Sequence, residues 1–482
     1  MPMRPLRGER VLAVAAAVVG VVGIVSALTP EFADRSDFVR GVLPPGVPGA
    51  ARVLALAFGL ALVWLSRLLA RRRRRAWQLA VALVTGISIA HLAKGLDVEE
   101  ATLGFVLLVA LLRYRSRFDV PGDPRSVRPL LATALALLAL AALAFVLELR
   151  GLAGDRWDNI LAAVTLLLAT RALYLWFRPF SGRVRQSAEE RRLVRRLVRG
   201  DGQDSLAFFS LRRDKSYFFS PTRRSFLAYK VVGGAALVSG DPIGAAQEFP
   251  ELLSEFRRVC HARGWRLALL SIRGELLPLT RRLGLRAIKI GDEAVVRPAA
   301  FSLEGRPIRK VRQSVERGFS MAMDDLYREE ETLFALAGCG GRIGGFLHLV
   351  PSADGYSLGA MRRDRDTPNG LMEYLIVQLL LWAREHGTAE ISLNFCVFAD
   401  LLARTPRNAL DATARSALRV GDRIFQLERL LVFSRKFDPD WRPRYLCVEC
   451  LSDLPLVGVA YLRVESLLTP PGPWARRAAL KV

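Results

Sequence analysis

The sequence predicts an α-helical membrane domain of about six spans, followed by a mixed α/β cytoplasmic domain. Its 482 residues leave room for two or three domains. The formal net charge is +24, although 51% of the residues are hydrophobic. These two properties are separated along the chain, because apolar runs fill about the first 180 residues and a basic, alternating strand and helix pattern follows. So basic a chain favours a polyanionic partner, either nucleic acid or an anionic membrane surface.

Six apolar runs define the expected spans. Most approach the roughly 20 residues that cross a bilayer as a helix, and the fourth is short. A cleavable signal peptide is the alternative for the first run, but its cleavage pattern is weak and five more runs follow. The runs lie at residues 11–28, 51–69, 76–93, 98–112, 129–147 and 159–177.

Loop charges predict the orientation of these spans. Arginines dominate the N-terminal tail, the loop at Arg71–Arg75, the loop at 113–128 and the segment after residue 177, whereas the alternate loops are acidic or mixed. Because basic loops remain cytoplasmic, six spans with both termini inside satisfy every loop. We therefore expect a multi-pass protein of the inner (plasma) membrane with its C-terminal half in the cytoplasm.

The C-terminal half contains all five cysteines, which are expected to be reduced there. Cys447 and Cys450 form a single C-x-x-C inside a strand-like run, without the second pair that zinc requires, so no metal site is predicted. Residues 188–199 form a basic amphipathic helix pattern. Its apolar stripe fits either the inner leaflet or the inside of the domain, and the sequence leaves both open.

Strands and helices then alternate twice in a similar order. The first series has a hairpin turning at Gly233-Gly234, a helix near 246–263, a strand at 266–272, a helix near 275–283 and a strand near 286–290. The second begins near 307 with a basic helix, then a hairpin at 338–345, a strand at 355–361, a helix at 369–385 and a strand at 390–395. We expect domains at 1–180, 181–300 and 301–482, the last two being repeats of one fold.

Familiar catalytic motifs are absent or weak. The sequence has no P-loop and no H-E-x-x-H, and the glycine-rich GCGGRIGG lacks the last glycine of a dinucleotide fingerprint. Gly355-Tyr-Ser-Leu-Gly359 matches G-x-S-x-G, but Ser357 falls within an alternating strand rather than at a sharp turn before a helix. A hydrolase is therefore disfavoured.

A cationic stretch precedes the helix expected from Asn369. Residues 361–375 read MRRDRDTPNGLMEYL and place Arg362, Arg363 and Arg365 just before that helix. A helix N-terminus already attracts anions, so added arginines indicate a phosphate or carboxylate ligand. A solvated loop is the alternative.

Four tracts in register resemble the synthase domain of MprF-type aminoacyl-phosphatidylglycerol synthases (lysyl-phosphatidylglycerol synthases) over about residues 190–465. The tracts are Gly240-Asp-Pro242, Met361-Arg-Arg363, Pro368-Asn-Gly-Leu-Met-Glu373, and Phe433–Trp441 running into Arg444-Tyr-Leu446. The resemblance implies two acetyltransferase-like (GNAT-type) folds in tandem. It also implies transfer of an aminoacyl group from aminoacyl-tRNA to a phosphatidylglycerol hydroxyl, without a cofactor. The expected aminoacyl group is lysyl.

The chain also departs from the family. Full-length members have a larger membrane half, so six spans are more similar to the LysX type, and we expect this chain to differ from that type in having no lysyl-tRNA synthetase domain after Val482. CVFADLLART after the strand at 390–395 replaces the Ala-Pro-Leu tract of many members and leaves the amino acid open.

The expected site combines a base with cationic groups. Glu373 is the candidate base or reader of the substrate amine, and Lys436 with the Arg362/Arg363 pair would stabilise phosphate or oxyanion charge. The alternatives are a surface loop for Lys436 and Arg444 and a turn cap for Asp241. The expected substrate-binding residues are Asp241, Asn369, Gly370, Asn394, Arg444 and Tyr445.

Composition and resemblance agree on the partners. Aminoacyl-tRNA is a cytoplasmic polyanion, phosphatidylglycerol is an anionic lipid of the lipid bilayer, and an activated ester needs no ATP motif. Two other functions stay open: a transferase with another lipid or a peptidoglycan precursor as acceptor, and a non-enzymatic membrane-tethered RNA-binding protein. The oligomeric state, a homo-oligomer included, is also open.

Overall fold

The computed structural model describes most of the chain as two compact units. One comprises Met1–Ser181 with His261–Trp265, and the other comprises Gly182–Cys260 with Arg266–Val482. The described residues are 7–28, 47–95, 98–149, 155–178, 186–301, 331–339, 342–364, 366–367, 369–397 and 427–464. Arg365, Pro368, the basic helix expected after residue 307 and most of CVFADLLART lie outside them.

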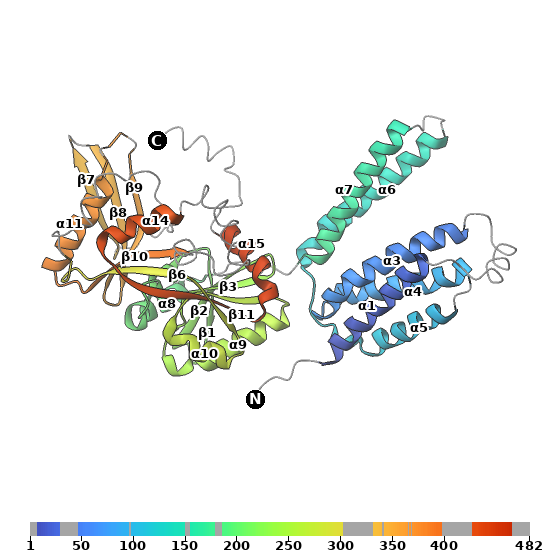
Figure 1. Cartoon of the computed structure of the whole chain (residues 1–482), viewed down its shortest axis with the longest axis horizontal. Helices are drawn as coiled ribbons and strands as arrows, with labels where there is room; N and C mark the ends of the chain where they lie inside the picture. Colours follow the sequence, from blue (N-terminus) through green and yellow to red (C-terminus); the bar gives the residue numbers. More distant parts are fainter. Residues whose placement is uncertain are drawn as a thin grey trace. The chain divides into compact units, whose positions relative to one another are not determined.

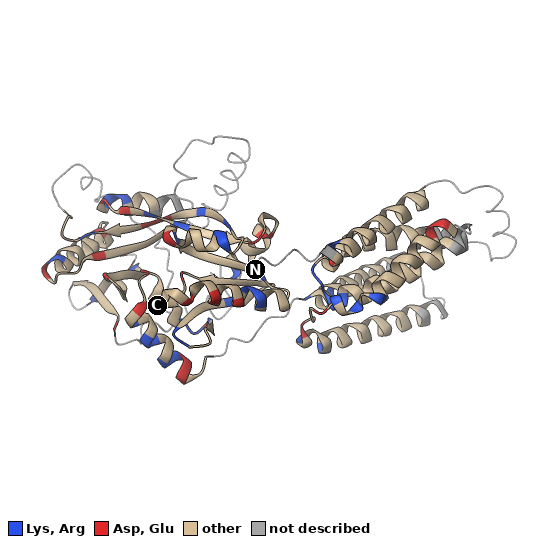
Figure 2. Cartoon of the chain, turned by 90° about the horizontal axis from the view of Figure 1, so that it is seen from below, with Lys and Arg blue, Asp and Glu red and all other residues tan. Residues whose placement is uncertain are grey.

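All six predicted apolar runs form helices in the N-terminal unit (Figure 1). Charged side chains gather near the helix ends and leave the helix bodies largely uncharged (Figure 2). Four helices share a core that contains Leu62, Leu65 and Leu111, and the other two form a hairpin. The helices are α1 (Arg7–Leu28), α3 (Val47–Leu69), α4 (Arg74–Gly95), α5 (Val98–Arg113), α6 (Val127–Leu149) and α7 (Asp155–Phe177).

Three of these helices are long and apolar enough to cross a membrane: Gly8–Leu28, Pro124–Ala144 and Asn159–Phe177. Val53–Leu69 is apolar but shorter. The six expected helices are thus present, and three of them fit a bilayer by length and composition. This supports membrane association, whereas the expected number of six spans stays a prediction.

The second unit is built on one eleven-stranded sheet among the described residues. The strand order is β1-β2-β3-β5-β11-β6-β10-β9-β8-β7, with β4 paired to β2. The strands are β1 (Ser216–Phe219), β2 (Ser225–Val232), β3 (Ala235–Ser239), β4 (Ile243–Gly244), β5 (Arg266–Arg273), β6 (Arg286–Val296), β7 (Leu333–Cys339), β8 (Arg342–Ser352), β9 (Gly355–Arg363), β10 (Glu390–Val397) and β11 (Asp440–Val448). The helices are α8 (Ala188–Asp201), α9 (Phe249–Ala262), α10 (Leu277–Arg282), α11 (Leu371–Glu385), α14 (Leu427–Ser434) and α15 (Leu454–Val464), with short 3-10 turns η3 (Ala207–Leu211) and η8 (Arg435–Phe437).

The order of elements repeats, as the sequence indicates. Hairpin β2–β3, helix α9 and parallel strand β5 correspond to hairpin β8–β9, helix α11 and parallel strand β10. Each parallel strand contains an irregular residue with positive φ, Ser271 (58°) in β5 and Asn394 (73°) in β10. The assignment of both repeats to the acetyltransferase-like fold, and the domain boundaries, stay predictions.

The two repeats exchange strands. Strand β6, from the first series, pairs with β10 of the second, while β11, from the second series, lies between β5 and β6 (Figure 1). Each series therefore depends on a strand of the other to complete its part of the shared sheet. This exchange brings β5, β6, β10 and β11 together and positions the site described below.

Helix α8 packs its apolar stripe inside the second unit. Val194 and Val198 are buried in a core with Phe208, Phe226 and Val350. Of the two interpretations that the sequence leaves open, the structure has the inward-packed helix. Ser187 caps its N-terminus by a reciprocal bond with Glu190, which fixes where the helix begins.

Candidate functional site

The structure divides the predicted site residues into groups rather than one cluster. Glu373 and Lys436 contact each other, and Arg444 belongs to a buried ion cluster with Asp241 beside it. Asn394 donates to the carbonyl of Leu358 at 2.9 Å. Tyr445 follows Arg444 in β11 and is half-buried. The remaining residues, at the end of β9 and the start of α11, are Arg362, Arg363, Asn369 and Gly370.

Glu373 and Lys436 form a buried ion pair. Lys436 Nζ donates to Glu373 Oε1 at 2.9 Å, and the ammonium also lies 5.6 Å from the ring centroid of Phe433. Glu373 belongs to the first turn of α11, and Lys436 to η8. Both side chains are buried, so the surface-loop alternative for Lys436 is wrong. The pair ties α11 to the segment that leads into β11.

Arg362 and Arg363 cannot act as one clamp on a phosphate. They are successive residues of β9, so their side chains point to opposite faces of the sheet. Arg363 Nη1 donates to the carbonyl of Thr367 at 3.2 Å and so braces the turn before α11. Gly370 immediately precedes α11, and its φ of 93° is a conformation that favours glycine.

Arg444 is the centre of the larger ion cluster, and it is not on a surface loop. Its Nη2 donates to Asp204 Oδ1 at 2.7 Å and to Ser205 Oγ at 3.0 Å, and its Nε donates to Glu293 Oε2 at 3.1 Å. Burial alone would lower the pKa of Arg444, but the charges of Asp204 and Glu293 outweigh burial and raise it. The guanidinium therefore remains charged and fixed.

Glu293 links the exchanged strands at this cluster. Its Oε1 accepts from Ser392 Oγ of β10 at 2.5 Å and from Ser205 Oγ, while Oε2 accepts from Arg444 of β11. Because Glu293 lies on β6, one carboxylate joins three strands from both repeats. Its full burial is tolerated because its oxygens have charged or hydroxyl donors.

Asp241 lies beside this cluster and pairs with Arg273. Arg273 donates to it twice, from the backbone nitrogen at 3.1 Å and from Nε at 2.5 Å. Burial, and then the negative charge of Asp204, raise the pKa of Asp241 from 3.8 to about 6, although Arg273 opposes them. Asp241 thus does more than cap a turn, and its charge changes near neutral pH.

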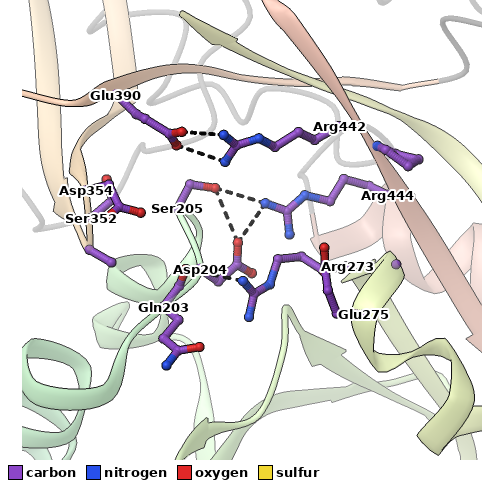
Figure 3. A pocket seen from close by; sticks show the side chains of 13 residues that line it. Gln203, Asp204, Ser205, Arg273, Glu275, Ser352, Asp354, Glu390, Arg442 and Arg444 are labelled. Atoms are coloured by element: carbon purple, nitrogen blue, oxygen red, sulfur yellow. Dashed lines mark hydrogen bonds and ion pairs between the residues drawn. The ribbon is translucent and has the colours of Figure 1, made fainter. Parts of the chain in front are cut away.

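A cavity of about 240 Å³ opens over these residues (Figure 3). The side chains of Arg442, Arg444 and Arg273 are drawn around it (Figure 3). Arg442 pairs with Glu390 and Arg444 with Asp204, as Figure 3 also shows, and Arg273 pairs with Asp241. Its lining residues are Gln203, Asp204, Ser205, Arg273, Gly274, Glu275, Ser352, Ala353, Asp354, Glu390, Arg442, Pro443 and Arg444. We call this space the arginine cavity.

Asp204, which lines this cavity, has a buried carboxylate oxygen without a hydrogen-bond partner among the described residues. Oδ1 accepts from Arg444 and from the backbone nitrogen of Leu206, whereas Oδ2 has no hydrogen-bond partner among the described residues, although it is buried. A buried acceptor without a donor is costly, and such atoms commonly mark a ligand or catalytic site. Asp204 is therefore the best-placed base in the described part of this cavity.

A second cavity, of about 90 Å³, has Gly240 and Ser271 in its lining. Arg212, Lys215 and Lys230 line it with the single carboxylate of Asp214, so its charges favour an anion. Burial alone would raise the pKa of Asp214, but the hydrogen bond from Lys230 and the charge of Arg212 lower it to about 2. The other lining residues are Leu206, Phe209, Leu237, Ser239, Gly240, Leu270, Ser271, Phe395, Tyr461 and Val464.

The G-x-S-x-G serine does not have the setting of a nucleophile. Ser357 is completely buried in the interior of β9, opposite Val350 of β8. His348 of β8 is also buried, and burial lowers its pKa to about 4. The hydrolase interpretation therefore gains no support from the described residues.

Sequence reasoning missed most residues of the arginine cavity. Asp204 and Ser205 follow α8 in a polar stretch without a motif, and Arg442 belongs to a tract that was noted for its other residues. Glu293 could have been found, because an acidic residue inside an otherwise apolar buried strand needs a partner. The partner itself depends on the strand exchange, which no local pattern predicts.

Known proteins resemble this second unit. A family model described as "Phosphatidylglycerol lysyltransferase, C-terminal" matches residues 194–317 and 313–448, together more than half of the 482 residues. The lysylphosphatidylglycerol biosynthesis bifunctional protein LysX of Gordonia bronchialis is 31% identical over 363 residues, which are 65% of this chain and 32% of that protein. LysX of Nocardia farcinica is 33% identical over 317 residues, 56% of this chain and 28% of that protein.

The chain therefore spans about a third of the length of these curated relatives. Among solved structures, L-PGS from Bacillus licheniformis matches 58% of this chain and 97% of its own at 20% identity, with a TM-score of 0.49. The family match covers the arginine cavity and the Glu373–Lys436 pair together. The chain belongs to the MprF-type lysyl-phosphatidylglycerol synthase family, as its sequence motifs predict.

Proposed function

We propose that this protein transfers an aminoacyl group from aminoacyl-tRNA to a hydroxyl of phosphatidylglycerol, and that this group is lysyl. The reaction would take place at the cytoplasmic face of the inner (plasma) membrane, in which the N-terminal helices are embedded as multiple spans. The observation that carries the proposal is the family match over a region that contains a charged cavity, one of whose carboxylates has a buried oxygen without a hydrogen-bond partner among the described residues.

The arginine cavity would take the aminoacyl end of the donor. Its volume is below that of cavities that enclose drug-sized ligands, so it suits an aminoacyl group rather than a whole nucleotide. Three arginines and the carboxylates of Asp204, Glu275, Asp354 and Glu390 line it, which gives a formal balance of three positive and four negative charges. A lysyl ester brings ammonium groups that suit this balance.

The reaction needs a base and a group that stabilises the oxyanion. Asp204 Oδ2 would accept the proton of the glycerol hydroxyl while the oxygen of that hydroxyl attacks the ester carbonyl. The carbonyl oxygen becomes negative in the tetrahedral intermediate, where a guanidinium N–H can stabilise it. Collapse breaks the bond to the ribose oxygen, which receives the proton from Asp204, so atoms and charges balance.

The second cavity would hold the acceptor's phosphate. Its lining has three cations and one carboxylate, and its apolar residues include Phe209, Leu237 and Phe395. Such a wall suits a phosphate attached to an apolar group. Asp204 Oδ2 lies 3.6 Å from where a Cβ on Gly240 would be, so the proposed base is close to the backbone that lines this cavity.

The Glu373–Lys436 pair is the rival location for the chemistry. Helix α11 runs antiparallel to β9 and β10, so its start lies near the opposite end of β10 from Glu390. One aminoacyl group cannot occupy both places. Because Glu373 joins α11 to Lys436 of η8 and neither residue lines the arginine cavity, we propose that this pair positions α11, and that Lys436, the more exposed member, could reach a substrate.

The test reconstitutes the full chain in lipid bilayers that contain phosphatidylglycerol and supplies tRNA charged with radioactive lysine. Label should move to a lipid only when both charged tRNA and phosphatidylglycerol are present. Transfer that persists with phosphatidylglycerol replaced by another lipid would indicate another acceptor. Binding of tRNA without any transfer would favour the RNA-binding alternative and contradict the proposal.

A further inference from the structure

Two kinds of ion pair line the arginine cavity. Arg444 and Asp204 expose 2% and 3% of their side chains, whereas Arg442 and Glu390 expose 44% and 21%. Arg442 on β11 and Glu390 on β10 extend toward each other from opposite walls (Figure 3). Arg442 Nη1 donates to Glu390 Oε2 at 2.8 Å, and Nη2 donates to Oε1, so the pair is bidentate.

The exposed pair can open at little cost. Water and salt screen a pair at this exposure, so it contributes little net stability. Arg444 and Arg273 cannot be released in the same way, because each is held by at least one buried carboxylate. After the Arg442–Glu390 pair has opened, Glu390 would still have a cation nearby, because Arg297 Nε lies 3.9 Å from Glu390 Oε1.

We propose that the Arg442–Glu390 pair is exchanged for the donor substrate: a donor phosphate replaces Glu390 on Arg442, and a donor ammonium binds the freed Glu390. The inference rests on the proposed function, because it takes the donor to be a nucleotide that bears an aminoacyl group. The arginine cavity would thus recognise a ligand with both charges and bind a ligand with either charge alone less well.

The chemistry of the two side chains supports this ligand class. A guanidinium fork matches phosphate oxygens as well as it matches a carboxylate. A simple anion would also meet the carboxylates of Glu275 and Asp354, which line the same cavity. The other lining residues are largely polar, so the phosphate and aminoacyl end of a hydrophilic donor fit better than the acyl chain of a lipid.

The experiment uses the full-length protein and a hydrolysis-resistant probe, 3′-deoxy-3′-lysylamido-adenosine 5′-monophosphate. Two companion probes lack the phosphate or have both amines acetylated. We expect Arg442→Gln to weaken binding of the complete probe by about tenfold, as for loss of a charge-assisted bond, and to leave the phosphate-free probe unaffected. Glu390→Gln should weaken the complete probe similarly and leave the acetylated probe unaffected.

The matched control is Arg223→Gln. Arg223 is about as exposed as Arg442 (48% against 44%) and pairs at 3.1 Å with the more exposed Glu189. Neither residue lines the arginine cavity, so this variant should bind all probes like the wild type. The reversed pair, Arg442→Glu with Glu390→Arg, restores the ion pair and should keep near-wild-type thermal stability without restoring binding. Restored binding would mean a merely structural pair and would overturn the inference.

Failure of the inference can be told from failure of the proposed function. If Arg442→Gln weakens the phosphate-bearing and phosphate-free probes equally, or neither, the exchange is overturned even where labelled lysine still reaches the lipid. If the selective losses occur but no lipid is labelled, the exchange is supported and the proposed transfer fails.

Discussion

Arg444 holds together groups that would otherwise repel each other. Removing its charge leaves Asp204 and Glu293 buried without their cation. Breaking one side of a buried ion pair typically costs about 3–5 kcal/mol, so Arg444→Gln should lower the free energy of unfolding by that amount. Denaturant unfolding measures this, with exposed Arg223→Gln expected within about 0.5 kcal/mol of wild type. A loss below about 1 kcal/mol for Arg444→Gln would contradict the assigned network.

The raised pKa of Asp241 should make stability and activity respond to pH in opposite directions. Because its pKa is raised from 3.8 to about 6, the folded state binds more protons between these values. The stability that depends on Asp241 should therefore fall, by about 1–3 kcal/mol, as pH rises from about 4 to 6, measured as the difference between wild type and Asp241→Asn. A difference that rises with pH would contradict the assignment.

Activity should change in the other direction. The ionised carboxylate accepts both bonds from Arg273, so protonation below about pH 6 loosens an arginine of the cavity. Lipid labelling by the wild type should decline below pH 6, whereas Asp241→Asn should be slow and nearly independent of pH between 5 and 7. An acid limb that persists in Asp241→Asn would place the titrating group elsewhere.

Gly355 controls the turn that leads into the arginine cavity. Its φ of 155° disfavours other residues, and a Cβ there would lie 2.0 Å from the carbonyl oxygen of Glu390. Gly355→Ala should therefore push the start of β10 aside, lower the melting temperature and reduce transfer. Gly284→Ala is the matched control, because its φ is also positive (76°) but an added Cβ meets nothing within 4 Å. Equal activity losses in both variants would mean that backbone strain alone is responsible.

The spacing of hydrophobic residues and the choice of turn residues can be read from short stretches of sequence. The sequence therefore predicts the helices and strands well. The turn at Gly233-Gly234 and the strands near 266–272, 355–361 and 390–395 lie where expected. Local patterns do not reveal which distant strands pair. Asp241 and Arg444 stand out in motifs, but the exchange that surrounds Arg444 with Asp204 and Glu293 depends on contacts 240 and 151 residues apart in sequence. The arginine cavity could therefore not be assembled from the sequence.

The strand exchange also makes the two repeats interdependent. Without β11, strands β5 and β6 lose the neighbour that joins them, so residues 182–301 alone should not unfold cooperatively. Co-expression with the remainder of the second unit should restore a cooperative transition, detected by circular dichroism. A stable, cooperatively unfolding fragment of residues 182–301 would contradict this interdependence.

The most direct test of the account compares single-turnover lysyl transfer to phosphatidylglycerol by wild type, Asp204→Asn and Glu373→Gln, at equal folded yield and saturating charged tRNA. If Asp204 is the base in the arginine cavity, Asp204→Asn should lose about 10²-fold or more of the transfer rate while tRNA binding is retained. Glu373→Gln should then lose mainly stability. Near-normal transfer by Asp204→Asn, with transfer lost in a folded Glu373→Gln, would contradict the account and move the chemistry to the Glu373–Lys436 pair.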